Sequence, residues 1–183
     1  FVDGLLTSRF LGPDVYSGIS VSMPLINIFF RIAAFLSAGC SIGCSRFVGT
    51  GKSDGANKVF NLTLALCAIF SVILVGACIL FPEQILTLCG VDLNKYPELQ
   101  PHIFGYLKGY LLAIPSILFI TVMGPIVVMD NDSRLFTISS VVVLVSDVIF
   151  DLLNVFIFHG EAFGMGLATS ISNVIQLLIL SLH

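Results

Sequence analysis

Charged residues are scarce in this sequence. Only 10% of its 183 residues are Asp, Glu, Lys or Arg, and 57% are hydrophobic. Soluble domains carry about 25% charged residues, and the mean hydropathy here is +1.06. We therefore expect an integral membrane protein that has the lipid bilayer as its surroundings.

The sequence also lacks an excess of basic residues. It holds 8 Lys and Arg against 11 Asp and Glu, a net charge of −3, and its pI is near 5.4. A protein that binds nucleic acid presents a basic face to the phosphates. The charge balance argues against nucleic acid as a partner.

Motifs for metal or covalent chemistry are missing as well. The five cysteines are scattered, with no CxxC pair and no Cys/His cluster, so neither a zinc site nor a disulfide framework is expected. Gly49-Thr-Gly-Lys-Ser53 ends like a phosphate-binding loop, but that motif needs Gly five residues before Gly51, where Arg46 stands. No nucleophile–base pair is visible. We expect a protein that is not an enzyme and that needs no cofactor.

The sequence contains several long apolar runs. A helix of about 20 apolar residues is long enough to cross a bilayer. The sequence predicts one all-α transmembrane bundle over residues 1–183, made of five full helices and the end of a first. The predicted helices cover residues 1–11, 15–44, 59–81, 103–129, 135–158 and 164–182. A short interfacial helix is predicted over 83–89. Because both ends of the chain lie next to or inside apolar runs, we expect a piece of a longer protein.

The loops carry a weak charge asymmetry. Loops 46–58 and 130–134 share one side of the membrane and hold four Lys or Arg residues, while the other side holds three. Basic loops favour the cytoplasm, so we expect loops 46–58 and 130–134 to be cytoplasmic.

Two acids inside the run 135–158 are the strongest functional signal. Asp147 and Asp151 lie four residues apart, on one face of the predicted helix and about 6 Å apart along its axis. An Asp at the centre of a membrane helix costs roughly 3 kcal/mol, and such residues usually belong to functional sites. Bracing of the bundle is the alternative explanation.

Two further residues with side-chain oxygens are expected at the same depth in the membrane as Asp151. Asp151 lies about 10 Å from the outer end of its helix, and Thr169 lies about 8 Å into the next helix from the same side. Asp3 lies at a similar distance from the end of the first helix. Oxygen ligands from three helices at one level suit a hard cation or a proton relay.

Arg31 is a charge near mid-membrane, at the depth of Asp147. We expect the two to form an intramembrane ion pair. The alternative is that Arg31 reaches an aqueous cavity. Two GxxxG patterns, Gly39–Gly43 and Gly105–Gly109, predict close approach of helix backbones.

Several local patterns, in order along the chain, resemble the N-terminal lobe of the multidrug and toxic compound extrusion (MATE) transporters. They are Val2-Asp3 with Arg9-Phe10-Leu11-Gly12, Gly39 and Gly43 with Ser45-Arg46, Gly49-Thr-Gly-Lys with Ala56, Tyr106-Leu107 with Pro115, Asp147 to Phe158, and Gly164 to Ser172. The resemblance covers essentially the whole chain.

The resemblance implies a twelve-helix transporter in the plasma membrane, of which this chain is most of one six-helix lobe. Its partners would be the rest of the first helix, the C-terminal lobe and small organic substrates. The implied cation site is Asp3, Asp147, Asp151 and Thr169. Asp147 stands where Asn is common, and Arg31 is unexpected, so the resemblance leaves H⁺ and Na⁺ both open as the coupling ion.

The expected function is export of organic, including cationic, drugs by cation-coupled antiport. A lipid-linked oligosaccharide flippase of the same superfamily is the nearest alternative, although such proteins line their cavity with several cations. A membrane scaffold without transport is the other alternative, and it has no use for costly acids inside the membrane.

Overall fold

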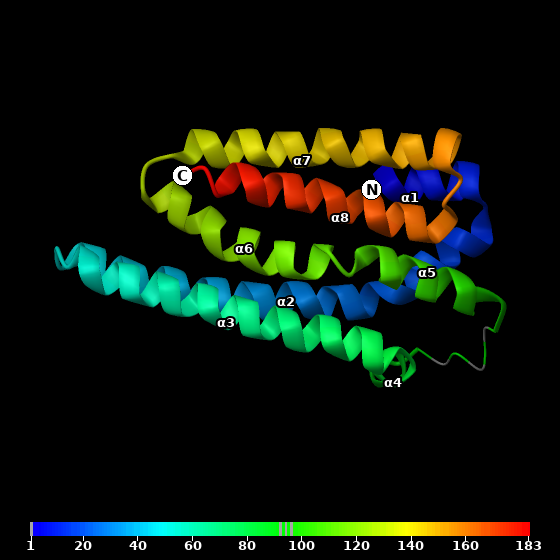
Figure 1. Ribbon diagram of the computed structural model, residues 1–183, viewed down its shortest axis with the longest axis horizontal. Coiled ribbons are helices and arrows are strands. Elements are labelled where there is room, and N and C mark those ends of the chain that lie inside the picture. The colour runs from blue at the N-terminus through cyan, green and yellow to red at the C-terminus, as the bar shows by residue number, and fades with distance from the viewer. Residues whose placement is uncertain (1, 92, 94, 96) are drawn as a thin grey trace.

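Helices account for nearly all of the chain, because a backbone in lipid must satisfy its hydrogen bonds within each segment. The computed structural model describes residues 2–91, 93, 95 and 97–183, and this part of the chain contains no strand (Figure 1). The all-α fold is confirmed. Its elements are α1 Val2–Leu6, η1 Thr7–Leu11, α2 Pro13–Gly49, α3 Ser53–Leu80, α4 Pro82–Leu88, η2 Pro97–Leu99, α5 Gln100–Tyr110, α6 Ala113–Met129, α7 Ser133–Leu153, η3 Asn154–Phe158 and α8 Glu161–Leu180.

The helices are long enough for a membrane. Among the described residues, four are long and apolar enough to span one, and α5 with α6 makes a fifth if the pair is one bent span. Helix α2 has 37 residues, about 55 Å at 1.5 Å per residue. It begins at Pro13, a residue favoured in the first helical turn, and it continues past the predicted end at Cys44 to Gly49.

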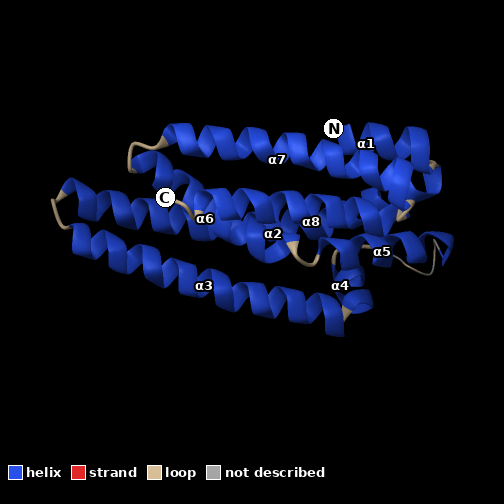
Figure 2. Cartoon of the chain, turned by 45° about the horizontal axis from the view of Figure 1, so that its top comes forward, coloured by secondary structure: helices blue, strands red, loops and turns tan. Residues whose placement is uncertain are grey.

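The bundle has two distinct ends. The turns between α2 and α3 and between α6 and α7 lie at one end, which we call the short-turn end (Figure 1). Helix α4 and the connection between α7 and α8 lie at the other, the long-connection end. Helices α3 and α7 lie on opposite sides of the bundle, with α2, α6 and α8 between them (Figure 2). Helix α1 runs beside the half of α7 nearest the long-connection end.

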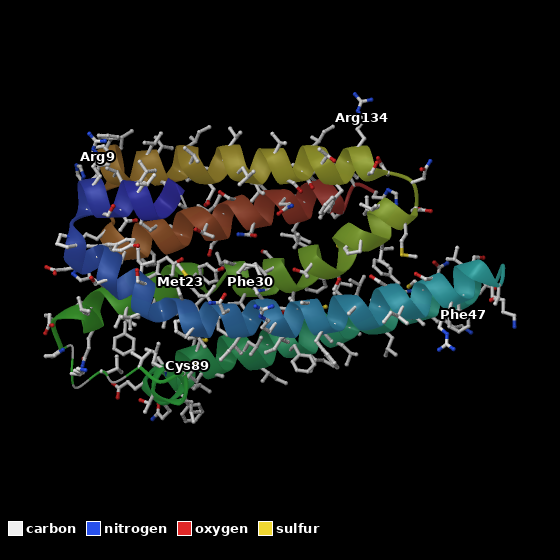
Figure 3. The ribbon with its side chains drawn as sticks, turned by 180° about the vertical axis from the view of Figure 1, so that it is seen from behind. Arg9, Met23, Phe30, Phe47, Cys89 and Arg134 are labelled. Carbon is white, nitrogen blue, oxygen red and sulfur yellow. The ribbon has the colours of Figure 1, made fainter. Side chains whose placement is uncertain are left out.

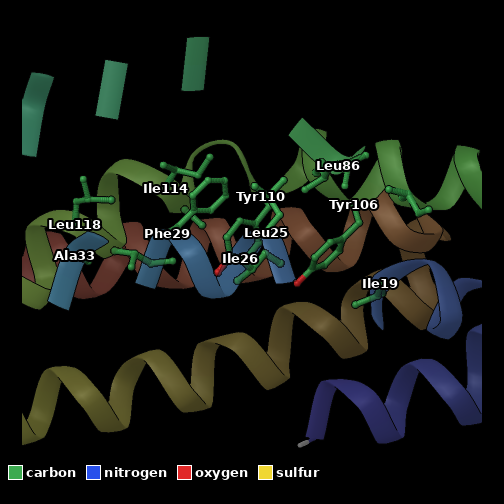
Figure 4. Packing of buried hydrophobic residues seen from close by; sticks show 14 of the residues in the cluster. Ile19, Leu25, Ile26, Phe29, Ala33, Leu86, Tyr106, Tyr110, Ile114 and Leu118 are labelled. Carbon is green, nitrogen blue, oxygen red and sulfur yellow. The ribbon is translucent and has the colours of Figure 1, made fainter. Parts of the chain in front are cut away.

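The core lies where α2 packs on α5 and α6 (Figure 4). Phe29 and Ala33 of α2 and Leu118 of α6 are at most 2% exposed. The hydroxyl of Ser37 donates to the Thr121 carbonyl oxygen at 2.6 Å and ties α2 to α6. In lipid, such packing and hydrogen bonds hold helices together, since lipid tails are as apolar as the side chains.

The predicted helix 103–129 is divided into two helices in the structure, α5 and α6. The axes of the two halves differ by 49° across the break between Tyr110 and Ala113. Pro115 explains the position of the break: it has no N–H, and its ring crowds the carbonyl group four residues earlier, that of Leu111.

Ser170 of α8 occupies the break. Its hydroxyl donates to the Gly109 carbonyl oxygen at 2.6 Å and accepts from the Ala113 N–H at 3.0 Å. Residues 109 and 113 are four apart, so they would bond directly in a continuous α-helix. The Ser170 oxygen stands in that place, as happens at many kinks where a side chain enters the helical ladder.

We expect Ser170→Ala to lower the free energy of unfolding by about 1–3 kcal/mol, because it leaves a buried N–H and carbonyl group without this partner. The measurement is the thermal or denaturant midpoint in detergent. Ser172→Ala is the matched control, since the Ser172 hydroxyl is also buried but bonds only within α8, to Ala168 at 2.9 Å. An equal loss in both variants would contradict a bridging role for Ser170.

Candidate functional site

Helix α7 presents its acids on the side away from lipid. The helix begins with Asp132, whose Oδ1 accepts a hydrogen bond from the Leu135 N–H at 3.1 Å. On the outer face of the helix, the apolar side chains of Val141 and Val145 are each 54% exposed. Asp151 is 0% exposed. The helical period therefore turns the carboxylate inward and the valines outward.

Asp147 lies one turn before Asp151 and is half-buried. The i, i+4 spacing puts the two carboxylates on one face, about 6 Å apart along the helix axis. This face also holds Ser139, which is fully buried. Helix α7 thus carries a polar stripe along the side that packs toward the bundle.

Asn154 fixes the corner between α7 and α8, and the sequence analysis did not identify it. Its Oδ1 accepts from the Gly160 N–H at 3.0 Å, and its Nδ2 donates to the Glu161 carbonyl oxygen at 3.1 Å. A Cβ added at Gly164 would overlap the Asn154 amide. The one available signal was an Asn five residues before a His-Gly turn, since an Asn side chain often satisfies backbone groups near a turn.

Thr169 is half-buried on α8, and its hydroxyl donates to the Met165 carbonyl oxygen at 3.2 Å. Helices α7 and α8 pack antiparallel on either side of the turn His159–Gly160. Asp151 and Thr169 each lie about 12–13 Å from that turn along their helices. The carboxylate of Asp151 and the hydroxyl of Thr169 are therefore carried at similar levels of two packed helices.

Asp3, the remaining predicted ligand, lies in α1, and its side chain is outside the described residues. Helix α1 packs against α7. The π-helices η1 and η3 are also linked there, since the rings of Phe10 and Phe156 meet edge-on with centroids 5.4 Å apart. Single π-helical turns often occur at functional sites.

A cavity of about 490 Å³ opens between α1, η1, α2, α5 and α8. This volume suits a small organic molecule. Asp147 and Asp151 are not among its lining residues, whereas Thr169 is. The lining residues are Gly4, Leu5, Thr7, Ser8, Tyr16, Ile19, Ser20, Met23, Tyr106, Met165 and Thr169.

Two polar lining residues, Thr7 and Tyr106, were not identified from the sequence as site residues. Thr7 is 2% exposed and Tyr106 is 6% exposed. Isolated Thr and Tyr residues in apolar runs are common, so their positions in the sequence carry little information about a site. In the folded chain both residues line the same cavity as Thr169.

The predicted ion pair between Arg31 and Asp147 is wrong. Arg31 is exposed on α2, and within the described residues it has no ion pair with any carboxylate. Helix α2 packs mainly on α3, α5 and α6. Equal depth in the membrane did not bring the two side chains together, because depth does not specify the direction in which each helix presents its residue.

The sequence predicts a cation site at these residues. Carboxylate and hydroxyl oxygens are the ligands of H⁺ relays and of hard cations. The described side chains contain no group of three His, Cys, Asp or Glu residues that could hold a metal ion. The predicted cation ligands Asp147, Asp151 and Thr169 therefore stay a prediction.

Comparisons with known proteins agree with the fold. A profile of the MatE family matches residues 1–153. A search of curated proteins found no match. Two similar solved structures are described as an inward-facing multidrug resistance MATE family transporter of the MOP superfamily and as MATE in the bent conformation. They match 98% of this chain at 21% identity, with TM-scores of 0.86 and 0.87. The chain spans 40% and 39% of their lengths.

Proposed function

The chain belongs to the MatE family, and from this premise we propose that it is part of a cation-coupled antiporter that exports organic compounds, cationic drugs included, by alternating access. The observation that carries the proposal is Asp151, a carboxylate that is 0% exposed within a transmembrane helix. Such a residue costs roughly 3 kcal/mol or more in a membrane, and one that is retained is generally functional.

The proposed coupling uses the charge of the acids. Entry of H⁺ or Na⁺ neutralises Asp151 and its neighbour Asp147, with Asp3 and Thr169 as further ligands. A ligand shifts a conformational equilibrium only by its different affinity for the two states. A cation that binds better when the cavity is open outward therefore favours that state and drives release of the organic compound outside.

Two alternatives make different predictions. A flippase for lipid-linked oligosaccharides would bind the pyrophosphate group with basic side chains, and the exposed Arg31 is compatible with that role. A site for a multiply charged group usually holds more than one basic side chain. A scaffold without transport gains nothing from a buried Asp151. Neither alternative predicts that a cation gradient drives movement of a small organic dye.

The test is transport by the full-length protein in proteoliposomes with an imposed Na⁺ or H⁺ gradient and a fluorescent cationic dye. We expect one of the two gradients to drive dye movement well above that in liposomes without protein. Absence of gradient-driven movement under both conditions, with protein that is folded and oriented, would overturn the proposal.

We also propose a plasma-membrane location with the short-turn end in the cytoplasm, supported by its Lys and Arg residues. In intact cells, a membrane-impermeant maleimide should label Glu98→Cys and leave Lys52→Cys unlabelled until the cells are opened. Burial raises the pKa of the native Cys89 thiol, which lowers its thiolate fraction at neutral pH and keeps its own labelling low. The reverse labelling pattern would contradict this orientation.

A further inference from the structure

Two thiols meet inside the lobe, in the part of α2 that leads to the short-turn end. Cys40 and Cys44 lie four residues apart on this helix, so both side chains lie on one of its faces. Their Sγ atoms are 3.9 Å apart, and the two residues are 1% and 3% exposed. The Cys44 Sγ also lies 3.5 Å from the Ala56 carbonyl oxygen of α3. Packing within this chain therefore holds the two thiols together.

The spacing of the two sulfur atoms fits a single metal ion between them. A metal–thiolate bond is about 2.3 Å long for Zn²⁺, and two such bonds to sulfurs 3.9 Å apart enclose an angle of about 116° at the metal. That angle is close to the tetrahedral value. A disulfide requires an S–S distance of about 2.0 Å, so the thiols would have to approach each other by about 2 Å. The pair is better placed for coordination than for oxidation.

Charge decides which metal ion the pair suits. A thiol loses its proton when it binds a metal, so two thiolates carry two negative charges. A divalent ion gives a neutral complex, whereas a monovalent ion would leave a buried negative charge, which is costly away from water. Thiolate sulfur prefers soft metals, while Mg²⁺ and Ca²⁺ prefer oxygen. We propose that Cys40 and Cys44 bind one soft divalent metal ion, of the chemical class of Cd²⁺, and release two protons to solvent.

A second, smaller cavity leads to this pair, and we call it the Cys44 cavity. It has a volume of about 220 Å³, lies between α2, α3 and α6, and is lined by Cys44, Asn57, Met129 and Asp130 among others. Pockets for drug-sized molecules are larger, about 300 Å³ or more. At about 30 Å³ per water, the Cys44 cavity has room for an ion with several waters. The exposed Asp130 offers a carboxylate that attracts an arriving cation.

The remaining coordination positions can be filled from the Cys44 cavity. Met129 brings a thioether, a soft ligand on a flexible side chain. The described side chains contain no group of three His, Cys, Asp or Glu residues that could hold a metal ion, so water from the cavity supplies what Met129 does not. Such a site is open on one side, unlike the closed four-ligand sites of structural zinc. We therefore expect the bound ion to exchange with the solvent in the cavity.

The test is titration of the reduced full-length protein in detergent with Cd²⁺, followed by the ultraviolet absorption of the cadmium–thiolate bonds. We expect the wild type to bind one ion at this pair with release of two protons. Cys40→Ser and Cys44→Ser should each lower the affinity for that ion about tenfold or more, because one thiolate cannot replace two. Met129→Leu should have a smaller effect, since water can take the place of the thioether.

Cys67→Ser is the matched control, because Cys67 is also fully buried but its thiol donates to the Leu118 carbonyl oxygen at 3.8 Å; its affinity should equal that of the wild type. Unchanged affinity in both Cys40→Ser and Cys44→Ser, or an equal loss in Cys67→Ser, would overturn the inference. So would a wild type whose thermal midpoint Cd²⁺ does not raise, since an ion bound only to the folded state stabilises it. That measurement requires no variant to fold. No transport is measured, so either result leaves the proposed function standing.

Discussion

Replacing Asp151 by asparagine should abolish gradient-driven transport while leaving a folded protein. Asparagine has nearly the same shape as aspartate, but it carries neither a charge nor an exchangeable acid proton. Without that charge, the coupling cation loses its preference for one state of the protein. Coupling between two ligands typically amounts to 5–150-fold, so we expect a loss on the order of 100-fold in the gradient-driven rate.

The readout is the initial rate of dye movement in proteoliposomes, compared with and without the gradient. Asp14→Asn is the matched control, because it makes the same chemical change at an exposed acid in the first turn of α2; it should transport at the wild-type rate. Asp147→Asn should have a smaller effect than Asp151→Asn, since Asp147 is only half-buried. Full gradient-driven transport by Asp151→Asn would exclude the proposed coupling.

Replacing Gly109 by valine should remove most of the folded protein. Even a Cβ at this position would run into the backbone of Phe163 and Leu167 on α8. Helix α8 cannot easily move away, because Ser170 holds the Gly109 carbonyl at 2.6 Å. Overpacking costs about 1–3 kcal/mol or more, a large part of a total stability of about 5–15 kcal/mol.

The measurement is the yield of monodisperse protein in detergent and its thermal midpoint. Gly39→Val is the matched control, since Gly39 also belongs to a GxxxG pattern inside a helix. An added Cβ at Gly39 meets no atom of a neighbouring segment within 4 Å. It should lower the midpoint by a few degrees at most. Equal losses at Gly39 and Gly109 would show that helix propensity, and not the contact with α8, is responsible.

These two glycines show how far the sequence could predict packing. Both GxxxG patterns predicted close approach, and the pair Gly105–Gly109 does pack on α8. In the other pair, Gly43 contacts Val59 of α3, whereas Gly39 faces open space. The pattern predicts that a helix can be approached closely, but it does not contain the position of the neighbouring helix.

The helices and the burial of Asp151 were predictable because hydropathy and spacing are local properties. The ion pair of Arg31 with Asp147 was predicted wrongly, since sequence distance gives depth and leaves out the rotation of each helix about its axis. The break at Leu111 was only partly predictable: Pro115 is visible in the sequence, but the group that fills the break, Ser170, comes from another helix. Interactions between distant segments require the fold.

The bridge made by Ser170 has a mechanical consequence. The residue before it, Thr169, lines the cavity, while Ser170 itself grips the Gly109 carbonyl and the Ala113 N–H across the bend. A rotation of α8 that moves Thr169 away from the cavity therefore also displaces the Ser170 hydroxyl, which bonds to both sides of the bend between α5 and α6. We therefore expect a molecule bound in the cavity to influence the angle between α5 and α6 through the peptide unit that joins Thr169 and Ser170.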